Sequence, residues 1–193
     1  MLFGAFAGAT VTVLLEPTFS GGANLAPWIG ILAGAVLGAI VSILHAYLSI
    51  NLNADQVISG TGINLLAVGL TVFMAQIIFG QQTTDTFESG FIKSTIPVLS
   101  DIPVIGRIFF ENIYLTVFIG FALVIITKFV VYKTTFGLRL RSTGENPHAS
   151  DSMGISVAKM RYIGVILSGA LAGLAGAIMV LTQNTQFNAV AIH

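Results

Sequence analysis

The 193 residues include 55% hydrophobic but only 8% charged side chains, whereas soluble domains carry about 25% charged residues. This composition excludes an ordinary soluble domain and indicates a membrane protein. Eight basic residues balance eight acidic ones, so the charge indicates no nucleic-acid partner. Without cysteine, these residues form no disulfide and no thiolate metal site. The three histidines, His45, His148 and His193, are scattered, so we expect no metal and no cofactor.

Four apolar runs reach the roughly 20 residues that a bilayer-spanning helix needs. They cover 28–50, 56–80, 113–131 and 162–181, and a shorter run at 2–15 resembles the remainder of a span. A single run of this kind also fits a core helix of a soluble protein, but four in one short chain favour a membrane. We therefore predict an all-α, polytopic membrane helix bundle. It forms one domain over residues 1–193, which we expect to be an internal part of a longer protein.

The connections between these runs differ in length and charge. Residues 16–27 form a Gly/Pro turn region, and 51–55 form a very short turn. The connection at 81–112 is long, and its second half, "IPVLSDIPVIGRIFFEN", carries two prolines that disfavour a spanning helix. We expect this half to lie at the membrane surface.

The basic residues predict the topology. Six of the eight Lys and Arg fall between Lys128 and Arg161, and such residues stay on the cytoplasmic side of a membrane. We therefore predict that 132–161 is a cytoplasmic loop and that 81–112 is extracellular. Counting back along the chain places 51–55 inside and 16–27 outside.

Glycines recur every four residues in three of the apolar runs. Small residues at this spacing let helix backbones approach closely in lipid. Glycine is common in membrane helices, but three such sets favour a tight bundle. The sets are Gly4 and Gly8; Gly30, Gly34 and Gly38; and Gly169 and Gly173.

Polar residues are concentrated in the run at 56–80. Intramembrane polar groups are expensive and often line a substrate path, although bonding between helices is an equal alternative. Gln56, Ser59 and Asn64 are our candidates for a substrate path. Gly60 and Gly62 suggest an irregular helix at this point.

Two further polar features stand near the ends of runs. "TQNTQFN" at 182–188 fits either a surface loop or the wall of an access vestibule, and we favour the loop. His45 stands about one turn from the cytoplasmic end of its run. It fits an interfacial residue, and a functional role stays open.

The polar stretch "RSTGENPHASDSMGI" contains the signals of a short helix. Asn146 is a favoured N-cap, Pro147 fits the first helical position, and Gly154 is a natural stop. We predict a helix at 147–153 on the cytoplasmic face. Because two helical turns are marginal in water, either a protein partner or the chain's own bundle must hold it. The basic residues that flank it are Arg139, Arg141, Lys159 and Arg161.

Three segments resemble one family. "FGLRLRSTGENPHASDSMGISVAKMRYIGVILSGALAGLAGA" resembles the cytoplasmic loop and following helix of ABC-transporter permeases. "LSINLNADQVISGTGINLLAVGLT" resembles a second signature of the ribose, simple-sugar and nucleoside branch, which is related to the branched-chain amino acid permeases. "IPVLSDIPVIGRIFFEN" resembles the outer loop of nucleoside-type members.

The resemblance implies that the short helix is a coupling helix, which docks on a cytoplasmic ABC ATPase. Its residues would be Gly144, Glu145, Asn146, Pro147, His148, Ala149, Ser150, Gly154 and Ile155. Members often have Ala where this chain has Ser150.

The implied function is that of a permease subunit of an importer for a nucleoside or a simple sugar in the bacterial plasma membrane. Its implied partners are the ATPase, a second permease subunit, identical or a sister chain, and an extracellular substrate-binding lipoprotein. The residues contain no Gly-rich segment ending in Gly-Lys-Ser/Thr, so the chain is not expected to be an enzyme. The alternatives are a secondary carrier or channel that works without ATP, and a structural membrane subunit.

Overall fold

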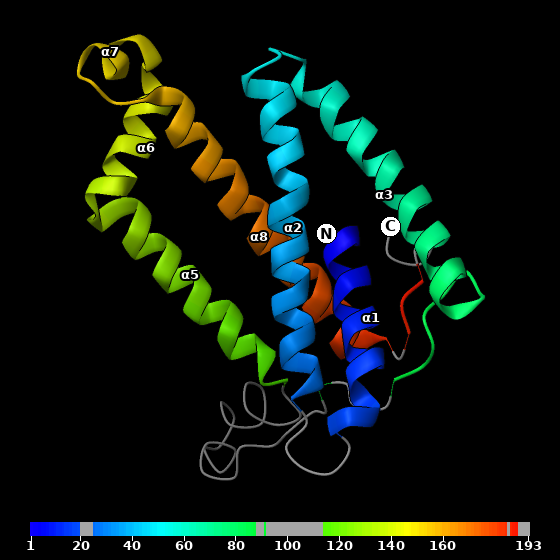
Figure 1. The fold of residues 1–193 in the computed structure, drawn as a ribbon. Coiled ribbons are helices and arrows are strands. Elements are labelled where there is room, and N and C mark those ends of the chain that lie inside the picture. The colour runs from blue at the N-terminus through cyan, green and yellow to red at the C-terminus, as the bar shows by residue number, and fades with distance from the viewer. Residues whose placement is uncertain (20–24, 88–90, 92–113, 185, 189–193) are drawn as a thin grey trace, which may run out of the picture.

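The computed structural model describes residues 1–19, 25–87, 91, 114–184 and 186–188, and it confirms the predicted all-α membrane bundle (Figure 1). Four helices, α2, α3, α5 and α8, are long and apolar enough to cross a membrane. The helices are α1 (Leu2–Phe19), α2 (Ala26–Ile50), α3 (Gln56–Phe79), α5 (Thr116–Lys133), α6 (Thr135–Glu145), α7 (Pro147–Ser152) and α8 (Val157–Gln183).

Three boundaries differ from the sequence prediction. Helix α1 continues through Pro17 to Phe19, where a turn region was expected; a proline in the last turn disrupts few helical hydrogen bonds. Helix α8 begins at Val157, before the predicted run at 162–181, and its start was missed because Lys159 and Arg161 interrupt the apolar signal. Helix α6 was not predicted, because its basic residues indicated a loop.

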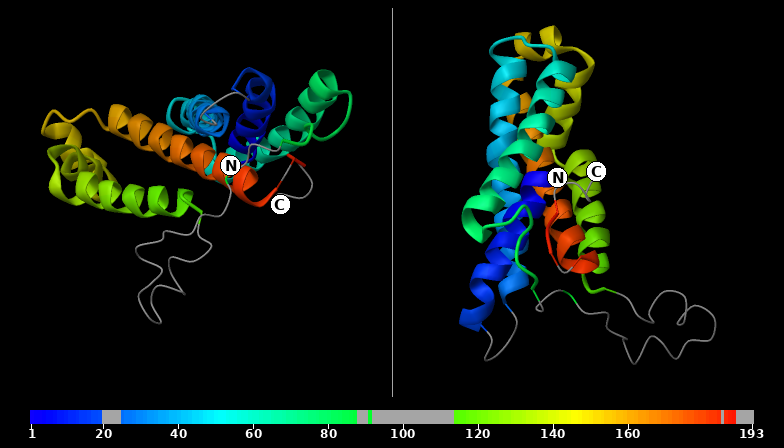
Figure 2. Two further views of the ribbon diagram at one scale, coloured as in Figure 1. Left: turned by 90° about the horizontal axis from the view of Figure 1, so that it is seen from below. Right: turned by 90° about the vertical axis from the view of Figure 1, so that its right-hand side faces the viewer.

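Helices α1, α2 and α8 form the centre of the structure, where they pack against one another (Figures 1 and 2). Helix α3 leans away from α2 at the end opposite α7, and α1 lies between them there. Helix α5 stands at the side and packs chiefly against α6 among the described helices. The centre is therefore tight, whereas α3 and α5 keep large exposed apolar faces.

Glycines bring the backbones of the central helices into direct contact. A methyl group built on Gly173 of α8 would overlap the carbonyl oxygen of Gly34 in α2 and lie 3.0 Å from Gly38 Cα. One built on Gly34 would lie 2.8 Å from the carbonyl oxygen of Gly4 in α1. Only glycine fits these positions without moving a helix, and the resulting contacts are of the kind that associate helices in lipid. The other glycines in these contacts are Gly8, Gly30 and Gly169.

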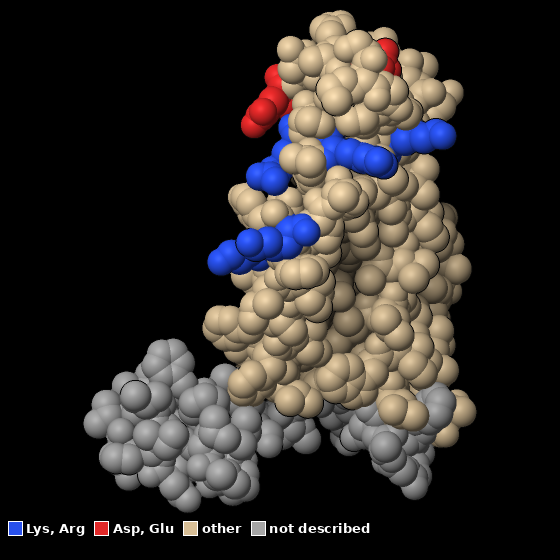
Figure 3. Space-filling model, turned by 90° about the vertical axis from the view of Figure 1, so that its left-hand side faces the viewer, with Lys and Arg blue, Asp and Glu red and all other residues tan. Residues whose placement is uncertain are grey.

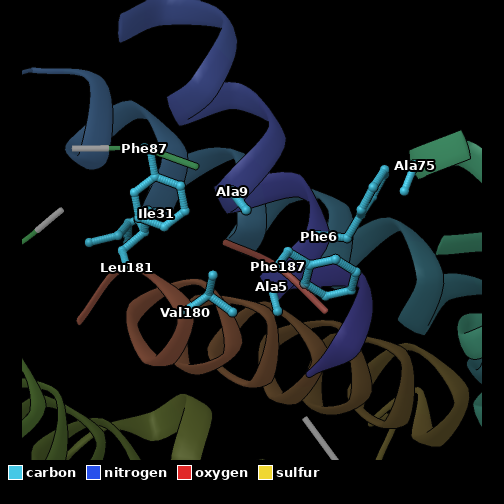
Figure 4. Close-up of a cluster of buried hydrophobic side chains, with 9 residues drawn as sticks. All are labelled: Ala5, Phe6, Ala9, Ile31, Ala75, Phe87, Val180, Leu181 and Phe187. Atoms are coloured by element: carbon cyan, nitrogen blue, oxygen red, sulfur yellow. The ribbon is translucent and has the colours of Figure 1, made fainter. Parts of the chain in front are cut away.

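The apolar core lies towards the end opposite α7 (Figure 4). Phe187 is fully buried, and its ring meets Phe6 edge to face with the centroids 5.4 Å apart. The Phe187 amide donates to Thr84 Oγ1 at 2.9 Å, and the Thr84 amide donates to the Phe187 carbonyl oxygen at 3.2 Å. The expectation of a plain surface loop at 182–188 is therefore wrong for its second half, because pairing with the segment after α3 holds Phe187 in the core.

Helix α3 runs without interruption through Gly60 and Gly62, so the expected irregularity is absent. The Asp55 carboxylate caps its start by accepting from the Val57 amide at 2.7 Å, and Thr61 Oγ1 donates to the Val57 carbonyl oxygen. The Asp55 bond gives a partner to a backbone amide of the first turn. Most of 81–112, including the segment expected at the membrane surface, and His193 lie outside the described residues.

Candidate functional site

A tight junction sets the position of the polar end of the molecule. Gly137 lies against the carbonyl oxygens of Val130 and Val131 at the end of α5, and a Cβ atom there would overlap both. Thr134 caps α6 by accepting from the Gly137 amide at 3.2 Å. The chain can therefore turn from the spanning helix α5 into α6 within two residues.

The cap that the sequence predicted for α7 is present. The Asn146 side chain accepts from the Ala149 amide at 3.1 Å, and Pro147 occupies the first helical turn. Asn146 also ends α6, where its own amide donates to the Ser142 carbonyl oxygen at 3.0 Å. One residue thus joins the two helices, which satisfies amides that would otherwise lack partners.

The far end of α7 is fixed in a similar way. Gly154 has a φ of 79°, the left-handed conformation that glycine adopts without strain. The Ile155 amide donates back to the Ser150 carbonyl oxygen at 3.1 Å, and the buried Ser150 hydroxyl donates to the Asn146 carbonyl oxygen at 3.0 Å. The helix is therefore closed at both ends by its own bonds.

Helix α7 presents a mixed polar and apolar surface. His148, Ala149 and Asp151 are exposed, and Met153, which follows the last helical residue, is 80% exposed. A single exposed apolar side chain is normal on a protein surface, so Met153 by itself does not identify a contact with another protein. The sequence reasoning did not select Met153, although an isolated methionine in a polar run was the available signal.

The predicted coupling residues lie together at this end of the molecule. Gly144 and Glu145 close α6, and the segment from Asn146 to Ile155 follows them directly.

A basic band separates this tip from the apolar helices (Figure 3). Acidic side chains lie on the tip above the band. Positive charge of this kind marks the headgroup level on the cytoplasmic side of membrane proteins. Every Lys and Arg within the described residues belongs to the set Lys128, Lys133, Arg139, Arg141, Lys159 and Arg161.

The turn between α2 and α3 lies at the same end as α7. Tyr162, near the start of α8, donates its hydroxyl to Asn51 Oδ1 at 2.6 Å. This bond ties the chain that leaves α7 to the turn at 51–55.

A cavity of about 310 Å³ lies between α1, α2, α3 and α8. His45 and Ser42 of α2 and Asn64 of α3 contribute its polar lining. Ser59 does not line it but contacts the ring of His45, with Oγ 3.0 Å from Nδ1. Gln56 is exposed at the start of α3 and is not among the lining residues. Of the three predicted path residues, Asn64 lines the cavity, Ser59 contacts a lining residue, and Gln56 does neither.

The chemistry of this cavity is that of binding. Hydroxyl, amide and imidazole groups offer hydrogen bonds, and no charged side chain lines the space. The described residues contain no group of three His, Cys, Asp or Glu side chains that could hold a metal ion. A small uncharged solute with hydrogen-bonding groups fits such a lining, because a charged one would lose its hydration without gaining a partner.

Comparisons with known proteins place the chain in a family. The chain is 44% identical over 187 residues to the guanosine ABC transporter permease protein NupQ of Bacillus subtilis, covering 97% of this chain and 58% of that protein. It is 44% identical to the nucleoside ABC transporter permease protein NupC of Lactococcus lactis, covering 92% and 55%. A putative glucose ABC transporter permease protein of Haloferax volcanii is 35% identical, covering 92% and 50%.

The chain thus spans a little over half the length of the first two of these relatives. No solved structure gives a significant match. The model of the branched-chain amino acid transport system / permease component family matches residues 1–191. Together with the apolar helices and the capped α7, this match shows that the chain is a multi-pass membrane protein that belongs to that permease family.

Proposed function

We propose that this chain forms part of the membrane-spanning subunit of an ATP-binding-cassette importer that carries a nucleoside across the bacterial plasma membrane. The carrying observation is α7, a helix closed at both ends and exposed at the basic end of a permease-family bundle. The nucleoside is proposed from the 44% identity to guanosine and nucleoside permeases. A simple sugar is the second candidate, supported by the putative glucose permease at 35%.

The proposed role of α7 is to dock on a cytoplasmic ATPase. Met153 and His148 would enter the partner surface, while the bonds of Asn146 hold α7 to α6. Because α7 is closed by its own hydrogen bonds, a push from the ATPase would move it as one piece. That motion would reach α5 through the tight junction at Gly137 and the turn at 51–55 through the Tyr162–Asn51 bond.

The remaining partners are proposed from family membership and exposed surface. A second permease subunit, identical or a sister chain, would complete the path, and an extracellular lipoprotein would deliver the solute to the outer loop at 81–112. The exposed apolar side chains of α5 support further helix contacts as well as lipid contacts. They include Phe121, Val124, Ile125 and Phe129.

Uptake of labelled guanosine tests the proposal. Cells carrying the full-length protein and its partners should take up guanosine in an ATP-dependent way that excess unlabelled ribose does not reduce. Uptake of labelled ribose without uptake of guanosine would transfer the assignment to the simple-sugar candidate. Uptake of guanosine that persists without ATP would favour a secondary carrier or channel.

Cross-linking tests the docking of α7 separately. This sequence contains no cysteine, so the substitution His148→Cys gives a single reactive site within it. Cross-linking to a cysteine on the candidate ATPase, with a yield that changes on adding ATP, is the expected result. A site that stays accessible to water and never cross-links would contradict docking and favour a structural subunit.

A further inference from the structure

Two polar side chains between the helices have few hydrogen-bond partners: the exposed Asn64 and the half-buried His45. Within the part of the chain that the structure describes, the Asn64 amide makes no hydrogen bond, and the side chain of His45 makes only the one to Ser59. Both residues line the cavity between α2 and α3. Polar side chains at membrane depth often line a solute path, and these two leave hydrogen-bonding groups open towards the same space.

The contact with Ser59 occupies Nδ1 of the His45 ring and leaves Nε2 without a partner among the described residues. Ser59 is buried, and within the described residues its hydroxyl has the Nδ1 atom of His45, 3.0 Å away, as its only acceptor. When the hydroxyl donates to Nδ1, the proton of the neutral ring lies on Nε2. The free group of His45 is then an N–H donor, held in place by the serine.

We propose that His45 is a solute-contacting, specificity-determining residue, whose Nε2–H donates to an acceptor on the base of the transported nucleoside. This inference rests on the proposed function. On a base edge, carbonyl oxygens and unprotonated ring nitrogens only accept, and N–H and amino groups only donate, whereas each sugar hydroxyl can do both. A fixed donor therefore discriminates between base edges but not between sugars. The Asn64 amide, with donors and an acceptor, pairs with the neighbouring group of the base.

The size and charge of the cavity agree with this solute. Its volume of about 310 Å³ lies at the lower end of the roughly 300–1,000 Å³ of small-molecule sites. Within the described residues no Lys or Arg side chain lines it, so a nucleotide phosphate would meet no basic side chain there. The site therefore selects the uncharged nucleoside over its phosphorylated forms.

Protection of an introduced cysteine measures whether a solute occupies the cavity. Ile63 of α3 lines the cavity, whereas Ile58 of the same helix is 73% exposed and does not. Ile63→Cys and Ile58→Cys are therefore a matched pair, each made in a full-length chain without other cysteines and assembled with its partners in membrane vesicles. Guanosine should slow labelling of Ile63→Cys by a small thiol reagent and leave Ile58→Cys unchanged. Guanosine 5′-monophosphate should protect neither.

Adding His45→Ala to the Ile63→Cys chain tests the contact itself. The guanosine concentration for half-maximal protection should rise about three- to tenfold, the range for one lost hydrogen bond. Ser59→Ala, which frees the ring, should raise it less, and Ser59→Thr, which keeps a hydroxyl, should restore it. These serine variants give the answer if His45→Ala fails to assemble.

The outcomes separate this inference from the proposed function. Unchanged protection in both His45→Ala and Ser59→Ala would overturn the inference, even if guanosine uptake is normal. Absence of guanosine uptake by the unaltered importer would overturn the proposed function, and with it the nucleoside contact. Normal uptake without any protection of Ile63→Cys would place the solute path elsewhere and overturn only the inference.

Discussion

The substitution Gly173→Ala should weaken the contact between α2 and α8 more than any comparable change on the same helix. The added methyl group would overlap the carbonyl oxygen of Gly34 and lie 3.0 Å from Gly38 Cα, and both are backbone atoms that cannot rotate away. Overpacking of this kind costs about 1–3 kcal/mol. Alanine regains at most about 1 kcal/mol through its higher helix propensity. With the full gain, the net expectation is a loss of up to about 2 kcal/mol in the free energy of unfolding.

Gly164→Ala is the matched control. It lies in the same helix, and its Cβ atom would meet only a side-chain atom, Leu140 Cδ1, at the ordinary distance of 3.4 Å. It gains the helix propensity without the clash, so it should be as stable as the unaltered protein or slightly more stable. Reversible unfolding of the full-length protein in mixed SDS micelles, followed by loss of helical circular dichroism, measures both variants. Equal stability of Gly173→Ala and Gly164→Ala would refute the close-packing argument.

Three further predictions concern the polar end of the molecule. Asn146→Ala removes the cap of α7 and should destabilise that helix by about 1 kcal/mol. ATP hydrolysis stimulated by solute should therefore fall in Asn146→Ala and be retained in Asn146→Ser. Equal rates of hydrolysis in the two variants would argue against a role of the cap. Met153→Asp should abolish co-purification of the ATPase and Met153→Leu should preserve it, because the proposed docking buries this exposed apolar side chain against the ATPase. Retention of the ATPase by both variants would exclude that role. Gly137→Ala should lower the thermal stability of the permease, because its methyl group overlaps backbone carbonyls. Gly120→Ala, whose methyl group would have no atom within 4 Å, should not lower it. A similar effect of both substitutions would show that the junction of α5 and α6 tolerates a side chain at Gly137.

The sequence alone was sufficient to predict the spanning helices and α7. Each spanning run is predominantly apolar over the length that a bilayer requires. Helix α7 has three local signals within a few residues, the cap at Asn146, Pro147 and Gly154. These signals act through neighbouring backbone atoms, so they can be read without knowing the fold.

The features that were missed depend on contacts between distant segments. Phe187 follows a polar run, and only its pairing with Thr84, far away in the sequence, shows that it belongs to the core. His45 and Ser59 lie on different helices, and the distance between their side chains depends on how the turn at 51–55 is folded. Helix α6 carries three charged residues within 11, Arg139, Arg141 and Glu145, so its composition resembled that of a loop.

The glycine contacts also determine how the molecule can change shape. Where Gly173 meets Gly34 and Gly38, backbone atoms of the two helices touch directly, so no rotamer change at that point can accommodate a new spacing. Helices α1, α2 and α8 make most of the described contacts between helices, whereas α3 and α5 make few. Movement of α3 and α5 relative to the central three helices therefore disturbs fewer backbone contacts than movement within the central group.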